Sequence, residues 1–309
     1  MTRTLLIHHP CFQDHLTGHG HPERPDRLKA VEHALDQEVF DPVERVLAPE
    51  TDLELARHVH ASAHLDRLLA AAPDTDMIYL DPDTAMSPKS LQAARHGLGG
   101  VQHAVDQVVG KANKNAFCAM RPPGHHAETD KAMGFCLFNT IAVGARYAQQ
   151  KHNLERIAIL DFDVHHGNGT QEIFWEDDSI LYASTHQMPL FPGTGARSET
   201  GCGNIVNSPL SAGDGPEEFR QAIQDAIIPR ISAFHPDMIL LSAGFDAHER
   251  DPLGSLRLTA EDFAWVTQQM MDLADSQCEG RIVSVLEGGY DLTGLADSVA
   301  AHVRQLMQA

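Results

Sequence analysis

The sequence predicts an α/β fold: a single domain, residues 1–309, with three αβα layers around a central, mostly parallel sheet of about eight strands. Short apolar runs rich in β-branched residues alternate with longer stretches of helical periodicity along almost the whole chain. No linker rich in Pro, Gly and Ser divides it. Unusual polar residues directly follow several apolar runs, at the carboxyl ends of predicted strands, where ligands bind in sheets of this kind.

Most of the predicted strands are short and apolar enough to be buried on both faces of a sheet. They cover residues 5–8, 77–80, 115–120, 156–160, 180–184, 204–207, 237–241 and 281–286. The stretches between them carry apolar residues at three- and four-residue spacing, which predicts helices. These cover residues 25–36, 62–72, 88–109, 138–152, 216–234, 259–276 and 295–307.

The composition narrows the classes of function. Lysine and arginine number 23 against 43 acidic residues, so the net charge of −20 repels phosphate backbones and we expect no nucleic-acid partner. Such acidity serves solubility and also suits cationic substrates such as lysine-containing peptides or polyamines.

The apolar run at residues 4–7 is too short for a signal peptide, and no segment approaches the length of a membrane span, so we expect a cytoplasmic protein without a membrane partner. The five cysteines are widely spaced and odd in number, which favours reduced thiols.

The segment that follows the predicted strand 156–160 carries metal-capable side chains at alternating positions. In extended chain, Asp161, Asp163 and His165 would point in one direction, with apolar residues between them pointing in the other. Carboxylates at the end of a buried strand are costly unless a cation or hydrogen bonds compensate them. Asp246 follows the strand 237–241, where it is either a helix N-cap or a third ligand that leaves one coordination position open for water.

Two further strand ends carry candidate catalytic groups. His125 and His126 follow Pro-Pro-Gly, a rigid turn that presents adjacent imidazoles from a loop. Tyr290 follows Glu-Gly-Gly, and its hydroxyl either packs or donates to a developing oxyanion opposite a metal. If the sheet is parallel, all of these groups meet at one edge of it.

Read in chain order, these motifs resemble the zinc-dependent histone deacetylase family of the arginase/deacetylase superfamily. The similarity is to class II-like bacterial members, the histone deacetylase-like amidohydrolases, and to acetylpolyamine amidohydrolases. The shared motifs are His-Pro-Glu-Arg-Pro (21–25), Arg-Pro-Pro-Gly-His-His-Ala (121–127), Asp-Phe-Asp-Val-His-His-Gly-Asn-Gly-Thr (161–170), Phe-Pro-Gly-Thr-Gly (191–195), Ala-Gly-Phe-Asp-Ala (243–247) and Glu-Gly-Gly-Tyr (287–290). The resemblance covers nearly the whole chain and implies the arginase/deacetylase fold.

The resemblance also implies a role for individual residues. It implies one Zn²⁺ per chain, with Fe²⁺ or Co²⁺ as other ions that the site would accept, held by Asp163, His165 and Asp246. Acid/base catalysis would fall to His125 and His126, with Asp161 orienting His125, and carbonyl polarisation to Tyr290. A structural K⁺ would be held by Asp161, Asp163, His165 and Ser184. The acyl-lysine tunnel and its rim would be formed by Asp83, Gly134, Phe135, Phe191 and Leu253.

Two positions depart from patterns found in the family. Asn168 stands where some members carry a carboxylate behind the second tandem histidine, and a neutral amide raises the pKa of that histidine less than a carboxylate would. Leu253 stands where polyamine-selective relatives carry a glutamate, which disfavours acetylpolyamines as substrates.

The sequence therefore predicts a zinc-dependent amidohydrolase that deacetylates N-acetyl-lysine side chains of peptides or proteins, or similar acyl-amines. An acetylpolyamine amidohydrolase is the main alternative. A binuclear manganese ureohydrolase shares the fold but lacks the tandem-histidine loop and the tyrosine after Gly-Gly. A non-catalytic acyl-lysine binding module would be expected to have lost a ligand or Tyr290, and none is lost here. The sequence leaves homo-oligomerisation open.

Overall fold

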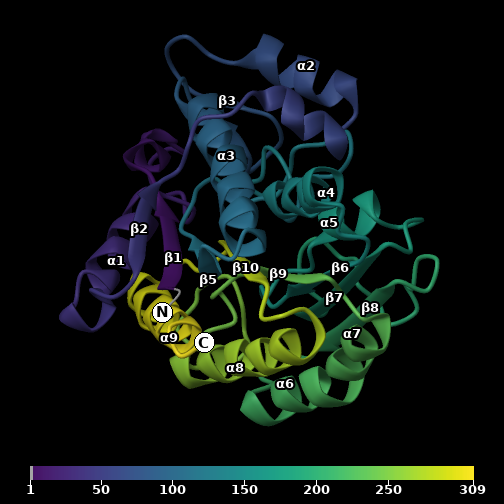
Figure 1. The fold of residues 1–309 in the computed structure, drawn as a ribbon. Helices are drawn as coiled ribbons and strands as arrows, with labels where there is room; N and C mark the ends of the chain where they lie inside the picture. The colour runs from purple at the N-terminus through teal and green to yellow at the C-terminus, as the bar shows by residue number, and fades with distance from the viewer. Residues whose placement is uncertain (1–2) are drawn as a thin grey trace.

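An eight-stranded sheet forms the centre of the computed structural model, which describes residues 3–309 (Figure 1). Every pair of neighbouring strands in it is parallel. The strand order is β2 (Glu44–Leu47), β1 (Arg3–His8), β5 (Asn113–Cys118), β10 (Ile282–Leu286), β9 (Met238–Ala243), β6 (Ile157–Asp161), β7 (Ile180–Gln187) and β8 (Ile205–Leu210). The predicted α/β class and the parallel sheet are confirmed.

Helices cover both faces of the sheet, as Figure 1 shows. One layer contains α2 (Ser62–Ala71), α3 (Ser90–Val109), α4 (Thr140–His152) and the short α5 (Asn168–Ile173). The other contains α1 (Asp26–Leu35), α6 (Pro216–Ala222), α7 (Ile228–Phe234), α8 (Ala260–Gln277) and α9 (Leu292–Leu306). Short 3-10 helices cover Pro10–Asp14, Glu38–Phe40 and Leu53–His58. Within residues 3–309, no helix combines the length and the apolar character that crossing a membrane requires.

The central strands are buried on both faces because helices lie above and below them. Every residue of β6, β9 and β10 is buried, and these strands are the continuous apolar runs seen in the sequence. Polar caps fix where two of the helices begin: Asn139 accepts from the Ala142 amide (3.1 Å) at α4, and Asp291 accepts from the Gly294 amide (2.7 Å) at α9. The cap of α9 directly follows Tyr290, so it also fixes the end of the loop that carries this tyrosine.

One expected strand was wrong, one strand was missed, and one expected helix contains an unexpected turn. Residues 77–80 do not join the sheet; β3 (Ile78–Tyr79) pairs only with β4 (Ala85–Met86), in an antiparallel hairpin outside it. The eighth strand is β2, an edge strand in which no residue is fully buried, so no apolar run marks it in the sequence. The predicted helix 216–234 is divided into α6 and α7 by a π-helical turn at Ile223–Ile227.

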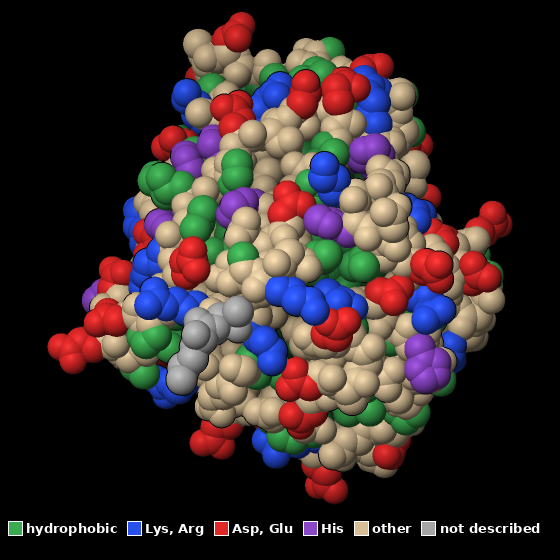
Figure 2. Space-filling view, viewed as in Figure 1, with side chains coloured by type: hydrophobic (Ala, Val, Ile, Leu, Met, Phe, Trp, Pro, Cys, Tyr) green, Lys and Arg blue, Asp and Glu red, His purple; other side chains and the backbone are tan. Residues whose placement is uncertain are grey.

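The charged side chains are spread over the surface of the molecule. On the face seen in Figure 2, acidic side chains lie in many separate places, and Lys and Arg lie between them. The excess of acidic side chains agrees with the net charge of −20, which repels a phosphate backbone.

Candidate active site

Four neighbouring strands deliver the candidate catalytic groups to one edge of the sheet. The strands β5, β10, β9 and β6 are adjacent in the sheet, and all run in the same direction. The segments that follow them carry, in that order, the tandem histidines, Glu287 to Tyr290, Asp246, and Asp163 with His165. The candidate catalytic groups therefore lie together at one edge of the sheet, as the sequence predicts.

Asp163, His165 and Asp246 form a buried cluster whose donor atoms face one another. The Nδ1 atom of His165 lies 3.2 Å from Asp163 Oδ1 and 3.0 Å from Asp246 Oδ2. One ligand atom from each of the three residues lies within 4.8 Å of the others. The strand β6 ends at Asp161, so Asp163 and His165 lie on the following loop, and the alternation expected of extended chain does not account for their convergence.

Backbone amides hold the two carboxylates in place. The amide of Gly288 donates to Asp163 Oδ2 (2.8 Å), and the amide of Val164 donates to Asp246 Oδ1 (2.8 Å). A Cβ atom at position 288 would overlap both carboxylates, so only glycine allows this approach. The carboxylate oxygens that remain are aimed at His165.

This cluster fits a divalent cation. Among the described residues, only histidines lie within ion-pair distance of Asp163 and Asp246. Without a metal, burial and the charge of Asp163 raise the pKa of Asp246 to about 7. Burial alone would lower the pKa of His165, but its two carboxylate partners outweigh burial and raise it to about 10, so a proton takes the place of a cation. Two aspartates and one histidine are a ligand set that suits Zn²⁺ with an open position.

The tandem histidines lie side by side but have different partners. Their ring centroids are 4.0 Å apart; His125 Nδ1 donates to Asp161 Oδ2 (3.0 Å), while His126 Nδ1 lies 2.8 Å from Asn168 Oδ1. Burial alone would lower the pKa of His125, but Asp161 and Asp163 outweigh burial and raise it to about 10. Burial, together with the positive charges of His125 and His165, holds the pKa of His126 well below its usual value. In the metal-free protein His125 is therefore cationic and His126 is neutral.

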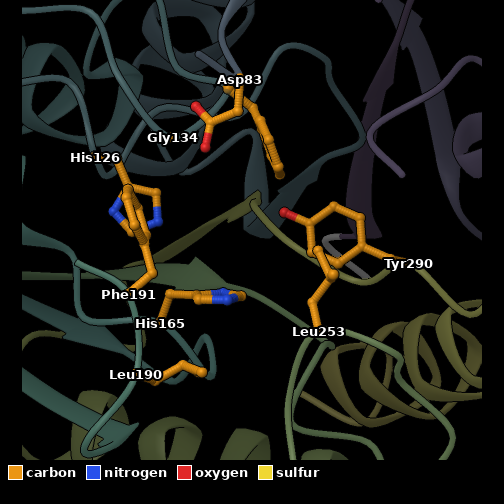
Figure 3. A pocket seen from close by; sticks show the side chains of 9 residues that line it. Asp83, His126, Gly134, His165, Leu190, Phe191, Leu253 and Tyr290 are labelled. Carbon is orange, nitrogen blue, oxygen red and sulfur yellow. The ribbon is translucent and has the colours of Figure 1, made fainter. Parts of the chain in front are cut away.

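Tyr290 lies on the loop after β10, and its hydroxyl points into the cavity (Figure 3). Burial, and then the charge of Asp246, raise the pKa of Tyr290 well above its usual value, so the hydroxyl keeps its proton. The guanidinium of Arg27 lies 5.0 Å from the centre of the tyrosine ring and donates to the Gly289 carbonyl (2.6 Å). The amide of Tyr290 donates to Asp251 Oδ2 (2.6 Å). These contacts fix a protonated hydroxyl in the cavity.

A cavity of about 270 Å³ opens above the cluster (Figure 3). It is lined by Asp83, His126, Gly134, Phe135, His165, Leu190, Phe191, Leu253 and Tyr290. Every residue predicted for the tunnel lines it, Asp83 included, and only Leu190 was not expected. Gly134 and Phe135 have positive φ angles of 56° and 69°, and a Cβ at position 134 would overlap the ring of His126. Glycine is therefore needed where the tunnel wall touches the second tandem histidine.

Comparison with known proteins agrees with this geometry. The histone deacetylase domain model matches residues 21–306. The chain therefore belongs to the histone deacetylase family. It is 39% identical to a probable deacetylase of Archaeoglobus fulgidus, covering 94% of this chain and 82% of that protein. It is 35% identical to type-2 histone deacetylase 2 of Dictyostelium discoideum over 99% of its own length, but spans only 21% of that longer protein.

A solved structure supports the same assignment. The crystal structure of the HDA15 HD domain matches with a TM-score of 0.94 and 36% sequence identity, covering 99% of this chain and 88% of that chain. The predicted family and fold are both confirmed.

Several polar residues that support the site in this histone deacetylase family member were not expected from sequence. Glu23 is fully buried and accepts from Arg121 Nη2 (2.7 Å) and Arg27 Nη1 (3.0 Å). Arg27 in turn holds the loop of Tyr290, and Arg121 directly precedes the turn of the tandem histidines. Glu287 accepts from the amides of Gly124 (2.6 Å) and His125 (3.2 Å). The His-Pro-Glu-Arg-Pro motif was the only signal in the sequence that pointed to Glu23.

Replacing Glu23 with glutamine is expected to destabilise the protein by about 3–5 kcal/mol, because two buried guanidinium groups lose their carboxylate. Burial would raise the pKa of Glu23, but Arg121 and Arg27 outweigh burial and lower it from 4.5 to about 2. The folded-state pKa lies below the unfolded one, so this carboxylate stabilises the fold above pH 4.5 by roughly 3 kcal/mol, and that contribution is lost as pH falls toward 2. Urea unfolding over a pH series measures both effects.

Glu54→Gln is the matched control for that measurement. Glu54 pairs with Arg57 on the surface (2.6 Å), and its removal should cost less than about 1 kcal/mol. If Glu23→Gln were no more destabilising than Glu54→Gln, the buried cluster would not stabilise this fold.

A second group of metal-capable side chains, His9, Cys11 and His96, has a structural explanation. The two imidazole rings are stacked 3.9 Å apart and inclined by only 18°, so their in-plane lone pairs do not converge on one point. The Nδ1 atom of His9 accepts from the Cys11 amide (3.1 Å) and caps the 3-10 helix. The Nδ1 atom of His96 donates to the Ala48 carbonyl (2.8 Å). All five cysteines are free, in agreement with the expected reduced thiols.

Proposed function

We propose that this protein is a zinc-dependent deacetylase that hydrolyses the amide of N-acetyl-lysine side chains to a free amine and acetate. One observation carries the proposal: a candidate metal ligand, a neutral imidazole and a protonated phenol line the same narrow cavity, as His165, His126 and Tyr290. Amide hydrolysis needs each of these groups, for activating water, for moving protons and for stabilising an oxyanion.

Asp163, His165 and Asp246 would hold the metal, with one coordination position left open. A divalent ion held by these three side chains would lower the pKa of a bound water molecule and polarise the acyl carbonyl. The three side chains are already gathered by backbone hydrogen bonds, so they need little rearrangement to bind it.

His126 would accept the proton of the attacking water, because it is the tandem histidine that stays neutral. The hydroxyl of Tyr290 would donate a hydrogen bond to the oxyanion that forms on the acyl oxygen. His125, held by Asp161, would keep positive charge beside the reacting centre. Protonation of the leaving nitrogen from the histidine pair then releases the amine and acetate.

The walls of the cavity suit a slender acyl-amine. Phe135, Phe191 and Leu253 present apolar surface, which matches the methylene chain of a lysine. Asp83 adds a carboxylate among these walls and could accept hydrogen bonds from the amides of a bound peptide. Leu253 lines the cavity where a carboxylate would favour the second ammonium group of a polyamine, which supports lysine side chains over polyamines.

We also propose a structural K⁺ next to the metal ligands. Asp161 and Ser184 are partners in the register of β6 and β7, and both are fully buried. Asp163 and His165 follow on the same chain segment. Oxygen atoms from these residues are the kind of ligand that a hard monovalent cation prefers.

The test is turnover of the zinc-loaded protein on an acetyl-lysine peptide and on acetylated putrescine and spermidine, each with a zinc-free control. We expect zinc-dependent acetate release and a higher kcat/KM for the peptide. A higher kcat/KM for the polyamines would replace this proposal with the acetylpolyamine amidohydrolase. No acetate from any of the three would contradict deacetylation, and two manganese ions per chain by metal analysis would favour a ureohydrolase.

A further inference from the structure

A chain of polar contacts continues from His126 away from the cavity and ends at a carboxylate. His126 Nδ1 lies 2.8 Å from Asn168 Oδ1, and Asn168 Nδ2 donates to Glu128 Oε1 over 2.7 Å. We infer that Glu128 is a positioning residue which, through Asn168, decides which ring nitrogen of His126 carries the proton. This inference rests on the proposed function, in which His126 accepts a proton from the attacking water.

The hydrogen-bond partners of Asn168 fix the orientation of its side-chain amide. The oxygen and nitrogen of an amide are told apart by their partners, and an ionised carboxylate can only accept. The end of Asn168 that faces Glu128 is therefore the NH₂ group. Its other neighbours, the His126 carbonyl and Met133 Sδ, are also acceptors but lie farther away, at 3.4 Å each. Glu128 is the strongest acceptor and fixes the amide.

The orientation of Asn168 in turn fixes the hydrogen on the imidazole of His126. Because the NH₂ group faces Glu128, the carbonyl oxygen of Asn168 faces His126, and a carbonyl oxygen can only accept. Nδ1 of His126 must then carry a hydrogen. A neutral imidazole has a single N–H, so Nε2 is left with a free lone pair, which a general base needs. In the neutral form, the ring hydrogen therefore sits on Nδ1, which lies 2.8 Å from Asn168 Oδ1.

Without the carboxylate of Glu128, the Asn168 amide would lose the acceptor that holds its NH₂ group. If Asn168 turned over, its NH₂ group would donate to Nδ1 of His126 and the hydrogen of the ring would move to Nε2. His126 could then no longer accept a proton from water. Some family members carry a carboxylate directly behind this histidine. Here Asn168 takes that place, and the carboxylate of Glu128 lies behind Asn168 and orients its amide.

A purely mechanical role for Glu128 would be to tie its loop to α5, on which Asn168 lies. The structure contains a second tie of that kind: Glu172, also on α5, accepts from the amide (2.9 Å) and the hydroxyl (2.7 Å) of Thr129. Glu172 joins the same loop to the same helix but makes no hydrogen bond with Asn168 or His126 among the described residues. It is therefore a matched control for anchoring.

The experiment exchanges donor and acceptor at position 128. In Glu128→Lys the new side chain can only donate, so Asn168 should turn its oxygen toward it. We expect kcat on an acetyl-lysine peptide to fall about 10- to 100-fold with little change in KM. Asn168→Asp alone places two carboxylates together and should also lower kcat. In the double variant a carboxylate accepts from both the lysine and His126 Nδ1, so kcat should return toward the wild-type value.

A positioning role and an anchoring role for Glu128 differ in how the effect of Glu128→Lys on kcat depends on the residue at position 168. An orienting role predicts that Glu128→Lys lowers kcat in the wild-type background and raises it in the Asn168→Asp background. Losses that simply add, or a loss no larger than that of Glu172→Lys, would overturn the inference. Zinc content and thermal unfolding of each variant show whether it is folded, and Glu128→Ala, expected to lower kcat as well, replaces the lysine variant if that one does not fold.

The second readout is spectroscopic and does not need turnover. Nitrogen-15 NMR of the histidine side chains reports the tautomer of His126 directly, with His126→Gln assigning the signal. We expect hydrogen on Nδ1 in the wild-type protein and on Nε2 in Glu128→Lys. The same tautomer in both would overturn the inference. If the wild-type protein released no acetate from any acyl-amine, the proposed function would fail, whereas the NMR result would still test the link from Glu128 to His126.

Discussion

Replacing Tyr290 with phenylalanine is expected to lower kcat about 100- to 1000-fold while leaving the bound zinc unchanged. The hydroxyl points into the cavity above His165, and its raised pKa keeps it a donor throughout the working pH range. Removing one donor to an oxyanion typically has an effect of about this size on kcat. Because the phenol is not among the candidate metal ligands, zinc content should stay at one ion per chain. Steady-state acetate release and metal analysis of the same preparation measure both quantities.

Tyr147→Phe provides the control, because it removes a tyrosine hydroxyl that donates to Asp106 between α4 and α3, away from the cavity. This variant should keep the kcat of the wild-type protein. A zinc-loaded Tyr290→Phe protein with nearly normal turnover would show that the phenol takes no part in the reaction, and another donor would have to be sought.

Replacing Asp246 with alanine should remove both the bound zinc and the activity. Asp246 supplies one of three convergent donors and is fully buried, so its loss leaves an incomplete site that solvent does not readily complete. Metal assistance is worth several kcal/mol, so we expect kcat to fall by more than about 1000-fold. Metal analysis after dialysis, followed by turnover with added zinc, measures the loss.

Asp272→Ala on the exposed surface of α8 is the control for this measurement, and it should retain zinc and turnover. If Asp246→Ala kept one zinc ion per chain, the metal would have to bind elsewhere. The assignment of the cluster as the catalytic metal site would then be wrong.

Periodicity predicted most of the architecture, and the strand ends predicted where the candidate catalytic groups meet, whereas the residues that line the cavity came from the family resemblance. The central strands are largely apolar because helices cover both of their faces. A continuous apolar run can be recognised from the sequence alone. The edge strand β2 was not predicted, because most of its residues are exposed to solvent and the strand therefore has no apolar run. Residues 77–80 were wrongly expected in the main sheet, because a short extended segment has the same sequence pattern in a hairpin as in a sheet.

The supporting residues escaped prediction for a different reason. Arg27 donates to the carbonyl of Gly289, 262 positions away, and no local pattern encodes such a partner. Asp163 and His165 were expected to converge because of strand alternation, but the strand ends at Asp161, so their convergence comes from the loop that follows it. Asn168 was recognised as a departure, but the carboxylate of Glu128 behind it was visible only once the loop and α5 were seen together.

The order of strands in the sheet also has a consequence for biosynthesis. The strand β10 is the last in the chain, yet it lies in the middle of the sheet and is the only strand that joins β5 to β9. A nascent chain that lacks residues 282–286 therefore holds two half-sheets, each with an unpaired apolar edge. One half bears the tandem histidines and the other bears the candidate metal ligands. We therefore expect neither activity nor a closed core until the final strand has left the ribosome.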